Sequence, residues 1–323
     1  MTASHYQIKQ YNTVQEFLKE TESSLEKGAA INTFPLWATK DLAPTSTSPQ
    51  YYGSIWFNDQ LQYVFVCVDH SGYIGWCGHN PLQDYSQSPD LTSLDLQQTM
   101  QQLLRQCYET IGPSLQYIQG YTTLGFYFYE QWKKIIIPGY DKTIMDKAIY
   151  DHPDEKSVWC LELPNRQALI YKETTQQLLS TDAGAYLRLA TEDDLDLLVA
   201  WIDQFMIDCN IPLDCVDTKE LCLHDIQQQN AYLWCIKDQP MGTIWKRRSL
   251  KEKKAISIAH VFIPKEHRSK GYAAAMVTQF SLLLFDDQYQ CLTLLMDGKR
   301  DPVKNMYASV GYKPIGSFAR LQI

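Results

Sequence analysis

"PKEHRSKGYAAAMV", residues 264–277, joins a basic loop to a run of small side chains. The preceding segment, 255–263, is apolar and rich in β-formers, and the alanines after Gly271 favour a helix. A helix N-terminus offers unpaired backbone N–H groups and a partial positive charge, so it binds phosphate groups readily. Gly271 lets a ligand approach the backbone closely, and Arg268 and Lys270 add positive charge. The loop therefore suits a pyrophosphate, with an ordinary helix start beside basic residues as the alternative.

Length and composition narrow the class of protein. The chain has 323 residues, of which 45% are hydrophobic and 20% charged, so two folded domains with sizeable cores are expected. A net charge of -8 argues against a protein that coats nucleic acid. No apolar run approaches the roughly 20 residues that span a membrane, and the first residues lack a signal-peptide pattern. Nine cysteines without a CxxC pair indicate reduced thiols, which predicts a cytoplasmic protein.

The first part of the chain alternates helical and strand patterns. "TVQE" (13–16) has the form of a capping box ahead of a helix. Residues 51–57 and 61–68 are typical of strands, with Asn58-Asp59 as the hairpin turn between them. Residues 91–111 predict another helix, and 121–150 stay ambiguous. Two further strands are expected in 157–172, joined at Pro164-Asn165.

The second part repeats a similar order of elements. A strand at 185–190 precedes Thr191 and Asp194, which repeat the capping pattern before a long helix. Three strands, a helix, a strand, a short helix and a last strand from Tyr312 follow. The order predicts a mixed α/β sheet and a distant duplication. We expect an N-terminal domain over 1–170, a linker over 171–184 and a C-terminal domain over 185–323.

Two motifs of the second part resemble those of a known family. Arg268-Ser-Lys-Gly271-Tyr-Ala273 fits the Arg/Gln-x-x-Gly-x-Gly/Ala pattern that the GNAT superfamily of acyl-CoA N-acyltransferases carries after its fourth strand. Tyr307 stands four residues before Gly311-Tyr312, as a Tyr does in that family. The chain looks most like the FR-type branch, in which a degenerate GNAT-like half precedes the catalytic half. "IQGYTTLGFYFYEQW" (118–132) resembles a segment of that degenerate half.

The resemblance implies both a fold and an activity. The fold would be α/β (α+β), with two tandem GNAT-like domains, each a mixed, mostly antiparallel twisted sheet flanked by helices. The activity would be N-acetyl transfer from acetyl-CoA to a primary amine of a small-molecule or peptide acceptor, by direct attack and without a metal. A non-catalytic acyl-CoA-binding sensor or scaffold is the first alternative, and an interaction module without coenzyme is the second. The acidic chain favours a cationic amine through steering.

The same resemblance assigns site residues position by position. Tyr307 would be the general acid that protonates the departing thiolate. Asn305 is a candidate coenzyme contact, although Asp301-Pro302-Val303-Lys304-Asn305 is one residue shorter than the family's usual segment. The remaining coenzyme-binding assignments are the pantetheine-pairing strand residues Val261, Phe262 and Ile263 and the pyrophosphate-binding residues Arg268, Ser269, Lys270, Gly271, Tyr272 and Ala273.

Other candidates rest on position alone. His260, just before the coenzyme-binding strand end, is a candidate general base, with a structural strand histidine as the alternative. Asp297 follows a strand and is a candidate for orienting the amine, again against a structural role.

Two side-chain groups have a structural default. Core packing is the default for three residues at helical spacing, Trp201, Phe205 and Met206. The alternative is that they line an acceptor pocket. No standard zinc spacing, and so no metal site, is found among Cys209, Cys215, Cys222 and His224.

Overall fold

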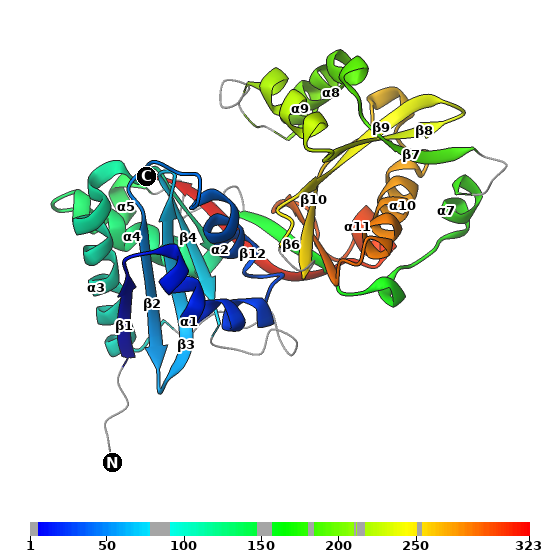
Figure 1. Ribbon diagram of the computed structural model, residues 1–323. Helices are drawn as coiled ribbons and strands as arrows, with labels where there is room; N and C mark the ends of the chain where they lie inside the picture. The colour runs from blue at the N-terminus through cyan, green and yellow to red at the C-terminus, as the bar shows by residue number, and fades with distance from the viewer. Residues whose placement is uncertain are drawn as a thin grey trace. The chain divides into compact units, whose positions relative to one another are not determined.

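A computed structural model describes residues 6–77, 91–146, 157–179, 184–209, 211, 217–250 and 254–323. The chain divides into two compact units, drawn in Figure 1. The first unit is Met1–Cys160 with Pro314–Ile323, and the second unit is Leu161–Lys313. Each contains a twisted sheet with helices against it. Within the described residues no helix is both long and apolar enough to cross a membrane.

The first unit begins with a strand, two helices and an antiparallel meander. The pairs β1–β2, β2–β3 and β3–β4 are antiparallel, whereas β4 and β5 are parallel. The order across the sheet is β1-β2-β3-β4-β5-β12. The strands and helices of this unit are β1 (Tyr6–Tyr11), α1 (Val14–Lys27), α2 (Thr33–Trp37), a π-helical turn (Ala38–Leu42), β2 (Tyr51–Phe57), β3 (Gln60–Val68), β4 (Ser71–Trp76), α3 (Leu94–Ile111), a 3-10 turn (Gly112–Ser114), β5 (Tyr117–Tyr121), α4 (Thr122–Ile136), α5 (Lys142–Met145) and β12 (Lys313–Gln322).

Local signals in the sequence set several of these elements. The Thr13 side chain caps α1 by accepting a hydrogen bond from the Glu16 backbone N–H at 3.2 Å, as predicted. Asn58 and Asp59 have φ values of +49° and +60°, which fits the left-handed turn of a two-residue hairpin between β2 and β3. The expected strands at 51–57 and 61–68 are therefore confirmed.

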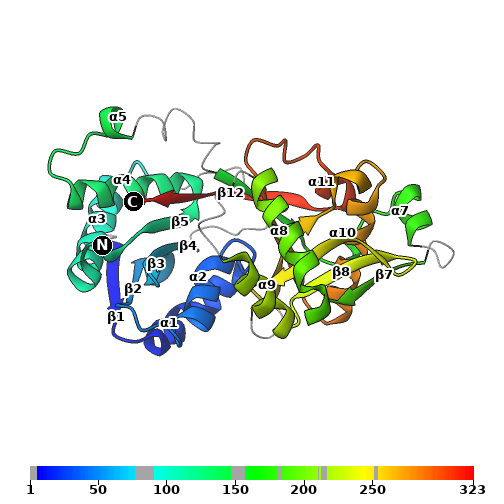
Figure 2. The ribbon, with the colours of Figure 1, turned by 90° about the horizontal axis from the view of Figure 1, so that it is seen from above.

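Helices cover both faces of the first sheet (Figures 1 and 2). On one face Phe65 of β3 packs against Phe128 of α4, with ring centres 5.2 Å apart. On the other face Tyr52 of β2 packs against Phe17 of α1 at 5.8 Å. The fully buried Trp132 of α4 adds to the first of these cores.

The second unit follows the same order of elements as the first. A strand and two helices precede three antiparallel strands, then come a helix, a strand parallel to the previous one and a short helix. The order across the sheet is β6-β11-β10-β9-β8-β7. Its elements are β6 (Ser157–Leu163, which crosses the unit boundary), a 3-10 turn (Arg166–Ala168), α7 (Glu173–Leu178), β7 (Ala185–Leu189), a 3-10 turn (Glu192–Asp194), α8 (Leu195–Asp208), α9 (Thr218–Gln227), β8 (Ala231–Ile236), β9 (Gln239–Arg247), β10 (Ala255–Phe262), a 3-10 turn (Lys265–His267), α10 (Tyr272–Asp286), β11 (Cys291–Asp297) and α11 (Met306–Val310).

The strand β8 shows how the second unit is layered, because its side chains alternate between the two faces of the sheet. Leu233 and Cys235 lie in the core formed with α8 and α9. On the opposite face, Tyr232 packs against Phe280 of α10 at 5.0 Å, and Trp234 Nε1 donates to Gln279 of α10 at 2.9 Å. The sheet therefore lies between α8 and α9 on one side and α10 on the other (Figure 2).

The chain departs from expectation at 166–172, where a second strand was predicted. A 3-10 turn occupies Arg166–Ala168, and Ile170 N donates to Val310 O at 2.8 Å. Here the backbone passes very close to Gly311, whose φ is +114°. A Cβ at that position would lie only 2.1 Å from Ala168 O. The prediction was wrong because this contact between distant segments leaves no sign in the local sequence.

The unit bounds also differ from the expected ones. The expected linker 171–184 contains α7, and Pro314–Ile323 belongs to the first unit. The reason is that β12 pairs antiparallel with β5, Phe318 opposite Tyr121 and Gln322 opposite Tyr117.

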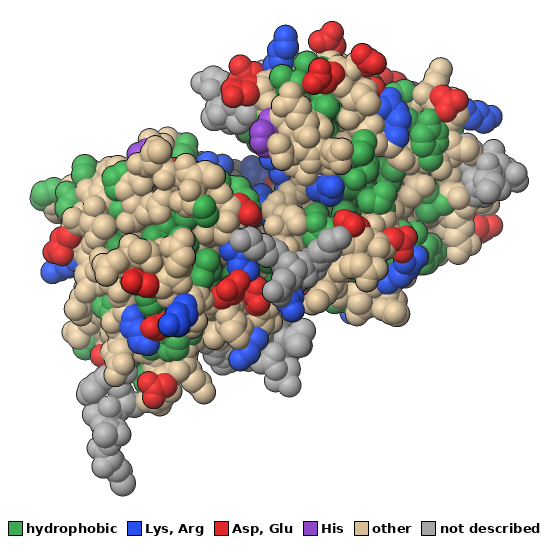
Figure 3. All heavy atoms as spheres, viewed as in Figure 1, with side chains coloured by type: hydrophobic (Ala, Val, Ile, Leu, Met, Phe, Trp, Pro, Cys, Tyr) green, Lys and Arg blue, Asp and Glu red, His purple; other side chains and the backbone are tan. Residues whose placement is uncertain are grey.

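Charged side chains of both signs are interspersed on the visible face of each unit (Figure 3). Lys9 and Glu20, for example, form an exposed ion pair at 2.8 Å. Such pairs contribute little to stability because water screens them.

Candidate functional site

The end of β10 contains a β-bulge. Ala259 lies opposite Trp245 of β9 and Phe262 lies opposite Thr243, so His260 and Val261 face one residue of the neighbouring strand. His260 has φ +48°, a left-handed conformation that is uncommon for residues other than glycine. A bulge bends its strand and commonly lies beside a functional site.

Beyond the bulge, β10 and β11 separate. Their parallel pairing covers Ala255–Ile258 and Cys291–Leu294. β10 continues to Phe262 and β11 to Asp297, and the described residues show no pairing between these continuations. The backbone of the predicted residues Val261 and Phe262 is therefore open on the β11 side, as an extended ligand would require.

The loop 268–271 leads into the N-terminus of α10, and its backbone N–H groups are available there as hydrogen-bond donors. Ser269 and Gly271 have φ values of +63° and +79°, and Lys270 lies between them. An alternation of this kind directs successive N–H groups towards one point and forms an anion-binding concavity. Within the described chain, the N–H groups of residues 269–274 have no hydrogen-bond partner, and Ala275 N makes the first bond, to Gly271 O at 3.1 Å.

The Arg268 side chain is engaged by the protein itself. Its guanidinium donates to Asp208 of α8 at 2.6 Å and to Ile263 O at 2.8 Å. The hydrogen bond from Arg268 holds the pKa of the Asp208 carboxyl below its usual value, with help from Lys265 at 3.7 Å. Arg268 thus ties the loop to α8, and the anion-binding capacity resides mainly in the backbone.

The other predicted loop residues differ in orientation. Lys270 Nζ donates to Glu266 O at 3.0 Å, and its ammonium lies 5.9 Å from the ring of Tyr272. Tyr272 packs against Trp234 at 5.4 Å and so contributes to the sheet side of α10. Ala273 is small and half-buried, which leaves room at the first helical turn.

Asn305 caps the short helix α11. Its Oδ1 accepts from Ala308 N at 3.0 Å, and its Nδ2 donates to the carbonyls of Asp301 and Pro302, both at 2.9 Å. The amide is therefore occupied by hydrogen bonds within the turn, and its expected coenzyme contact stays a prediction.

Tyr307 lies on α11 with an available hydroxyl. That hydroxyl makes no hydrogen bond within the described residues. Burial raises the pKa of Tyr307 to about 12, while the positive charge of Arg300 opposes the rise and Cys209 adds to it. The phenol therefore keeps its proton at neutral pH, which a general acid requires.

His260 is held in an aromatic environment. Its ring lies 4.5 Å from that of Trp245 and 5.4 Å from that of Phe205, and its Nδ1 is buried without a hydrogen-bond partner in the described chain. Burial, together with the smaller effects of the Arg247 and Arg248 charges, lowers the pKa of His260 to about 3. The imidazole is neutral at physiological pH and is a weak base.

The remaining candidates surround the same strand ends. Asp297 is exposed at the end of β11 and accepts from Lys299 N at 3.0 Å. Met206 is buried in the core, as the default interpretation expects. Trp201 and Phe205 are partly exposed, and Trp201 lies 6.2 Å from Phe262. The structure thus brings α8, β10 and the β11 end into one region.

The grouping of Cys209, Cys215, Cys222 and His224 was not expected to bind a metal, because its spacing fits no zinc pattern. Among the described residues no set of three or more His, Cys, Asp and Glu side chains could hold a metal ion. Cys215 lies outside the described residues.

Two features of this region had no sequence signal. Asp208 was not predicted as a site residue, because its contact with Arg268 joins two residues sixty positions apart in the chain. The bulge at His260 depends on the register with β9, which a single strand sequence does not encode.

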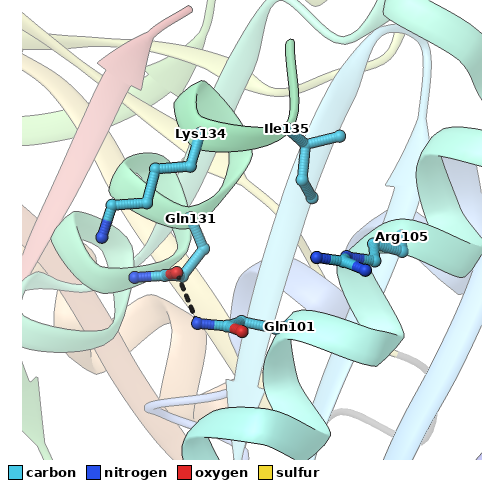
Figure 4. A pocket seen from close by; sticks show the side chains of 5 residues that line it. All are labelled: Gln101, Arg105, Gln131, Lys134 and Ile135. Atoms are coloured by element: carbon cyan, nitrogen blue, oxygen red, sulfur yellow. Dashed lines mark hydrogen bonds between the residues drawn. The ribbon is translucent and has the colours of Figure 1, made fainter. Parts of the chain in front are cut away.

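A separate pocket of about 400 Å³ lies between α3 and α4 of the first unit (Figure 4). Gln101 donates to Gln131 at 2.9 Å across its floor, and the Arg105 guanidinium points towards it. Lys134 is paired with Glu130 at 2.6 Å and points away. None of the predicted site residues lies there. The lining residues are Gln101, Arg105, Gln131, Lys134 and Ile135.

Comparison with known proteins identifies the fold. No protein-family model and no curated protein matches the sequence. Among solved structures, an acetyltransferase of the GNAT family from Colwellia psychrerythraea is 11% identical with a TM-score of 0.50, and the match covers 98% of this chain and 99% of that one.

Two further similar structures are also acetyltransferase-related. A tandem GNAT protein from the clavulanic acid biosynthesis pathway is 6% identical, with a TM-score of 0.47 and 98% of both chains covered. A fungal multi-domain β-N-acetylglucosaminidase with a glucosamine N-acetyltransferase region is 12% identical, with a TM-score of 0.49; the match covers 100% of this chain and 38% of that one.

The chain is thus an α/β protein of two similar units. Its fold is that of the GNAT acetyltransferases, as the Colwellia structure shows across almost its whole length. The predicted fold class and family resemblance are confirmed at the level of the fold.

Proposed function

We propose that the second unit transfers an acetyl group from acetyl-CoA to a primary amine. One observation carries the proposal: the unpartnered N–H groups of residues 269–274 stand directly after a strand whose end is separated from its neighbour. A diphosphate with a long polar arm needs both features, because the donors hold the phosphates and the open strand edge pairs with the arm.

The chain's own residues supply the remaining steps. The backbone of Val261–Ile263 aligns the pantetheine arm, and the donors of 269–274 hold the pyrophosphate. Bound acetyl-CoA supplies a thioester that an amine can attack directly. Tyr307, protonated and without an internal partner, donates its proton to the departing sulfur as the C–S bond breaks. The proton that the amine loses as the amide forms returns to the Tyr307 phenolate through solvent, which restores the phenol.

His260 is proposed as the second catalytic residue. Its pKa, lowered to about 3 by burial, favours a neutral hydrogen-bonding group over a strong general base. Its unpaired Nδ1 would contact the acceptor near the amine, where it would orient the nucleophile. Asp297 at the facing strand end is a candidate for the same task.

A non-catalytic acyl-CoA-binding protein is the second candidate. It is favoured by His260, whose pKa, lowered to about 3, makes it a weak general base. The free hydroxyl of Tyr307 favours the enzyme. The cytoplasm is the proposed compartment, since the described cysteines are free thiols.

The test measures thermal protection of the full chain by acetyl-CoA. Ligand that binds only the folded state raises the melting temperature. Gly271→Val forces a β-branched residue into φ +79° at the phosphate loop and should abolish the shift. Gly139→Val is the matched control, because Gly139 has φ +74° in the first unit and nothing within 4 Å of an added Cβ. Equal protection in both variants would contradict the pyrophosphate assignment.

A further inference from the structure

The side chain of Arg268 contacts the end of the strand that precedes the proposed phosphate loop. Its Nε donates to Ile263 O at 2.8 Å, and its guanidinium lies 5.5 Å from the centre of the Phe262 ring. The backbone donors proposed for the pyrophosphate, the N–H groups of 269–274, begin at the next residue. The conformation of Arg268 therefore connects the end of β10 with the start of the donor loop.

Asp208, the last residue of α8, binds the same guanidinium. Its Oδ2 accepts from Arg268 Nη2 at 2.6 Å, and its Oδ1 accepts from Gln204 Nε2 at 2.9 Å. Each carboxylate oxygen thus has its own donor, which fixes the orientation of the carboxylate. A hydrogen bond between two charged groups is also stronger and more directional than one between neutral groups.

The position of Asp208 is unfavourable for its charge within its own helix. The C-terminus of a helix carries a partial negative charge, so an acidic side chain there is disfavoured unless a cation lies nearby. Arg268 supplies that cation, and Lys265 Nζ lies 3.7 Å from the same carboxylate. The charge of Asp208 is therefore matched to the segment after β10 and not to α8.

The helix α8 is a fixed support for this contact. Its inner side chains are buried in a core that includes residues of β8 and β9. Trp201 of α8 also lies 6.2 Å from Phe262 of β10. These inner side chains are Leu198, Ile202 and Met206. The place of α8 is thus set by its core packing, independently of Arg268.

The donor loop, in contrast, is strained and has few internal bonds. Ser269 has φ +63°, a conformation that costs free energy for a residue other than glycine. The N–H groups of 269–274 have no partner in the described chain, so they do not hold the loop in shape. Lys270 donates to Glu266 O, within the same segment. The bond from Arg268 to Asp208, in contrast, joins the segment to a separate element.

From these contacts we infer that Asp208 is a positioning residue for the coenzyme: it holds Arg268, and Arg268 holds the end of β10 and the donor loop in the arrangement that receives acetyl-CoA. The guanidinium acts on the pyrophosphate through the backbone that it orients, and it stays with Asp208 in the bound state. The inference rests on the proposed acetyl-CoA site and adds to it a residue of α8.

A direct bond between Arg268 and a phosphate predicts the opposite effect of removing Asp208. If Asp208 only competed with the pyrophosphate for the guanidinium, its removal would free Arg268 and strengthen binding. If Asp208 positions Arg268, its removal weakens binding, although a negative charge is lost beside an anion site. The sign of the change in affinity therefore separates the two roles.

The experiment measures Kd for acetyl-CoA by calorimetry with the full chain. Asp208→Ala and Arg268→Ala should each raise Kd by about 10-fold, as expected for loss of a partly exposed, charged hydrogen bond. Because both residues act through one contact, the double variant should bind at most about 2-fold more weakly than Arg268→Ala. Asp208→Asn keeps the shape and an acceptor for Arg268, so its Kd should lie between those of the unaltered protein and Asp208→Ala.

Two controls separate positioning from charge and from stability. Glu20→Ala removes the acidic partner of an exposed ion pair in the first unit, Lys9–Glu20, and should leave Kd unchanged. Glu266→Ala removes an exposed carboxylate two residues before Arg268 and should not raise Kd. Melting of each variant without ligand completes the comparison, since a purely structural role would lower the melting temperature and leave Kd unchanged.

The outcomes distinguish this inference from the proposed function. Absence of acetyl-CoA binding by the unaltered protein would refute the proposed function itself. Binding by the unaltered protein together with an equal or lower Kd in Asp208→Ala would overturn the inference alone. A double variant whose loss equals the product of the two single losses would also overturn it, because the two residues would then act separately.

Discussion

Each unit contains a parallel strand pair joined by a helix, but the two helices begin differently. In the first unit, β4 and β5 pair over Ser71–Tyr73 and Tyr117–Gln119, with α3 between them. In the second unit, β10 and β11 are likewise parallel, and α10 joins them along the chain.

The helix starts and the strands before them differ. The Ser93 side chain caps α3 by accepting from Leu96 N at 3.4 Å, whereas Gly271 gives α10 no side-chain cap. The β3–β4 pairing is regular, whereas β9–β10 contains the bulge at His260. The topology is shared by both units and therefore does not define the proposed site. Two local differences define it: α10 has no side-chain cap, and β10 has an extra residue at its bulge.

Of the substitutions considered for the two units, Tyr307→Phe should have the largest effect, a loss of turnover. It removes the hydroxyl and keeps the ring beside Tyr312, 6.3 Å away. Turnover should fall by about 10²–10⁴-fold, the usual share of general acid catalysis. Affinity for acetyl-CoA, measured by calorimetry, should barely change, because the lost interaction belongs to the transition state. Full activity in this variant would leave Tyr307 as a packing residue.

Coenzyme stoichiometry should be one per chain. The unpartnered N–H groups of residues 269–274 lie in the second unit, so acetyl-CoA should titrate to a single site in calorimetry. Gly271→Val should remove that binding without leaving a weaker site. Residual micromolar binding would assign a coenzyme site to the first unit. The two units would then not differ in coenzyme binding.

Acid stability should depend on His260. Burial lowers its pKa from 6.5 to about 3, so between these values the unfolded chain binds a proton that the native protein does not. The free energy of unfolding should therefore decrease as the pH falls below about 6.5, by up to about 1.4 kcal/mol per pH unit. In His260→Asn and His260→Phe, urea unfolding between pH 4 and 7 should show the same shallower slope. A slope equal to that of the unaltered protein would contradict the buried neutral imidazole.

Ser93→Ala should have the smallest effect. Loss of the cap on α3 should reduce the free energy of unfolding by about 1 kcal/mol. Protection by acetyl-CoA should stay the same, because the helix start of the first unit takes no part in coenzyme binding. A parallel loss of protection would show that α3 contributes to the site.

Sequence patterns predicted the features that depend on neighbouring residues. The Thr13 cap, the Asn58-Asp59 turn and the Gly271 loop each rest on a few adjacent side chains. Segment 166–172 was misassigned because its path is set by Gly311, far along the chain. Residues 121–150 stayed ambiguous because aromatic side chains in α4 suit a strand as well as a buried helix face.

The features of the proposed site also differ in whether they depend on neighbouring or on distant residues. The glycine and its flanking residues are local, so the pyrophosphate loop could be proposed from sequence. The bulge at His260 and the bond between Asp208 and Arg268 arise from strand register and helix packing. Neither has a signature in the sequence of a single strand or helix.

The position of β12 has a consequence for synthesis of the chain. This strand completes the sheet of the first unit, yet it is encoded after the whole of the second unit. On the ribosome, β5 therefore emerges long before its antiparallel partner and keeps an unpaired edge in the meantime. Native assembly of the N-terminal half must wait for the last stretch to be translated, which exposes the nascent protein to aggregation during that interval.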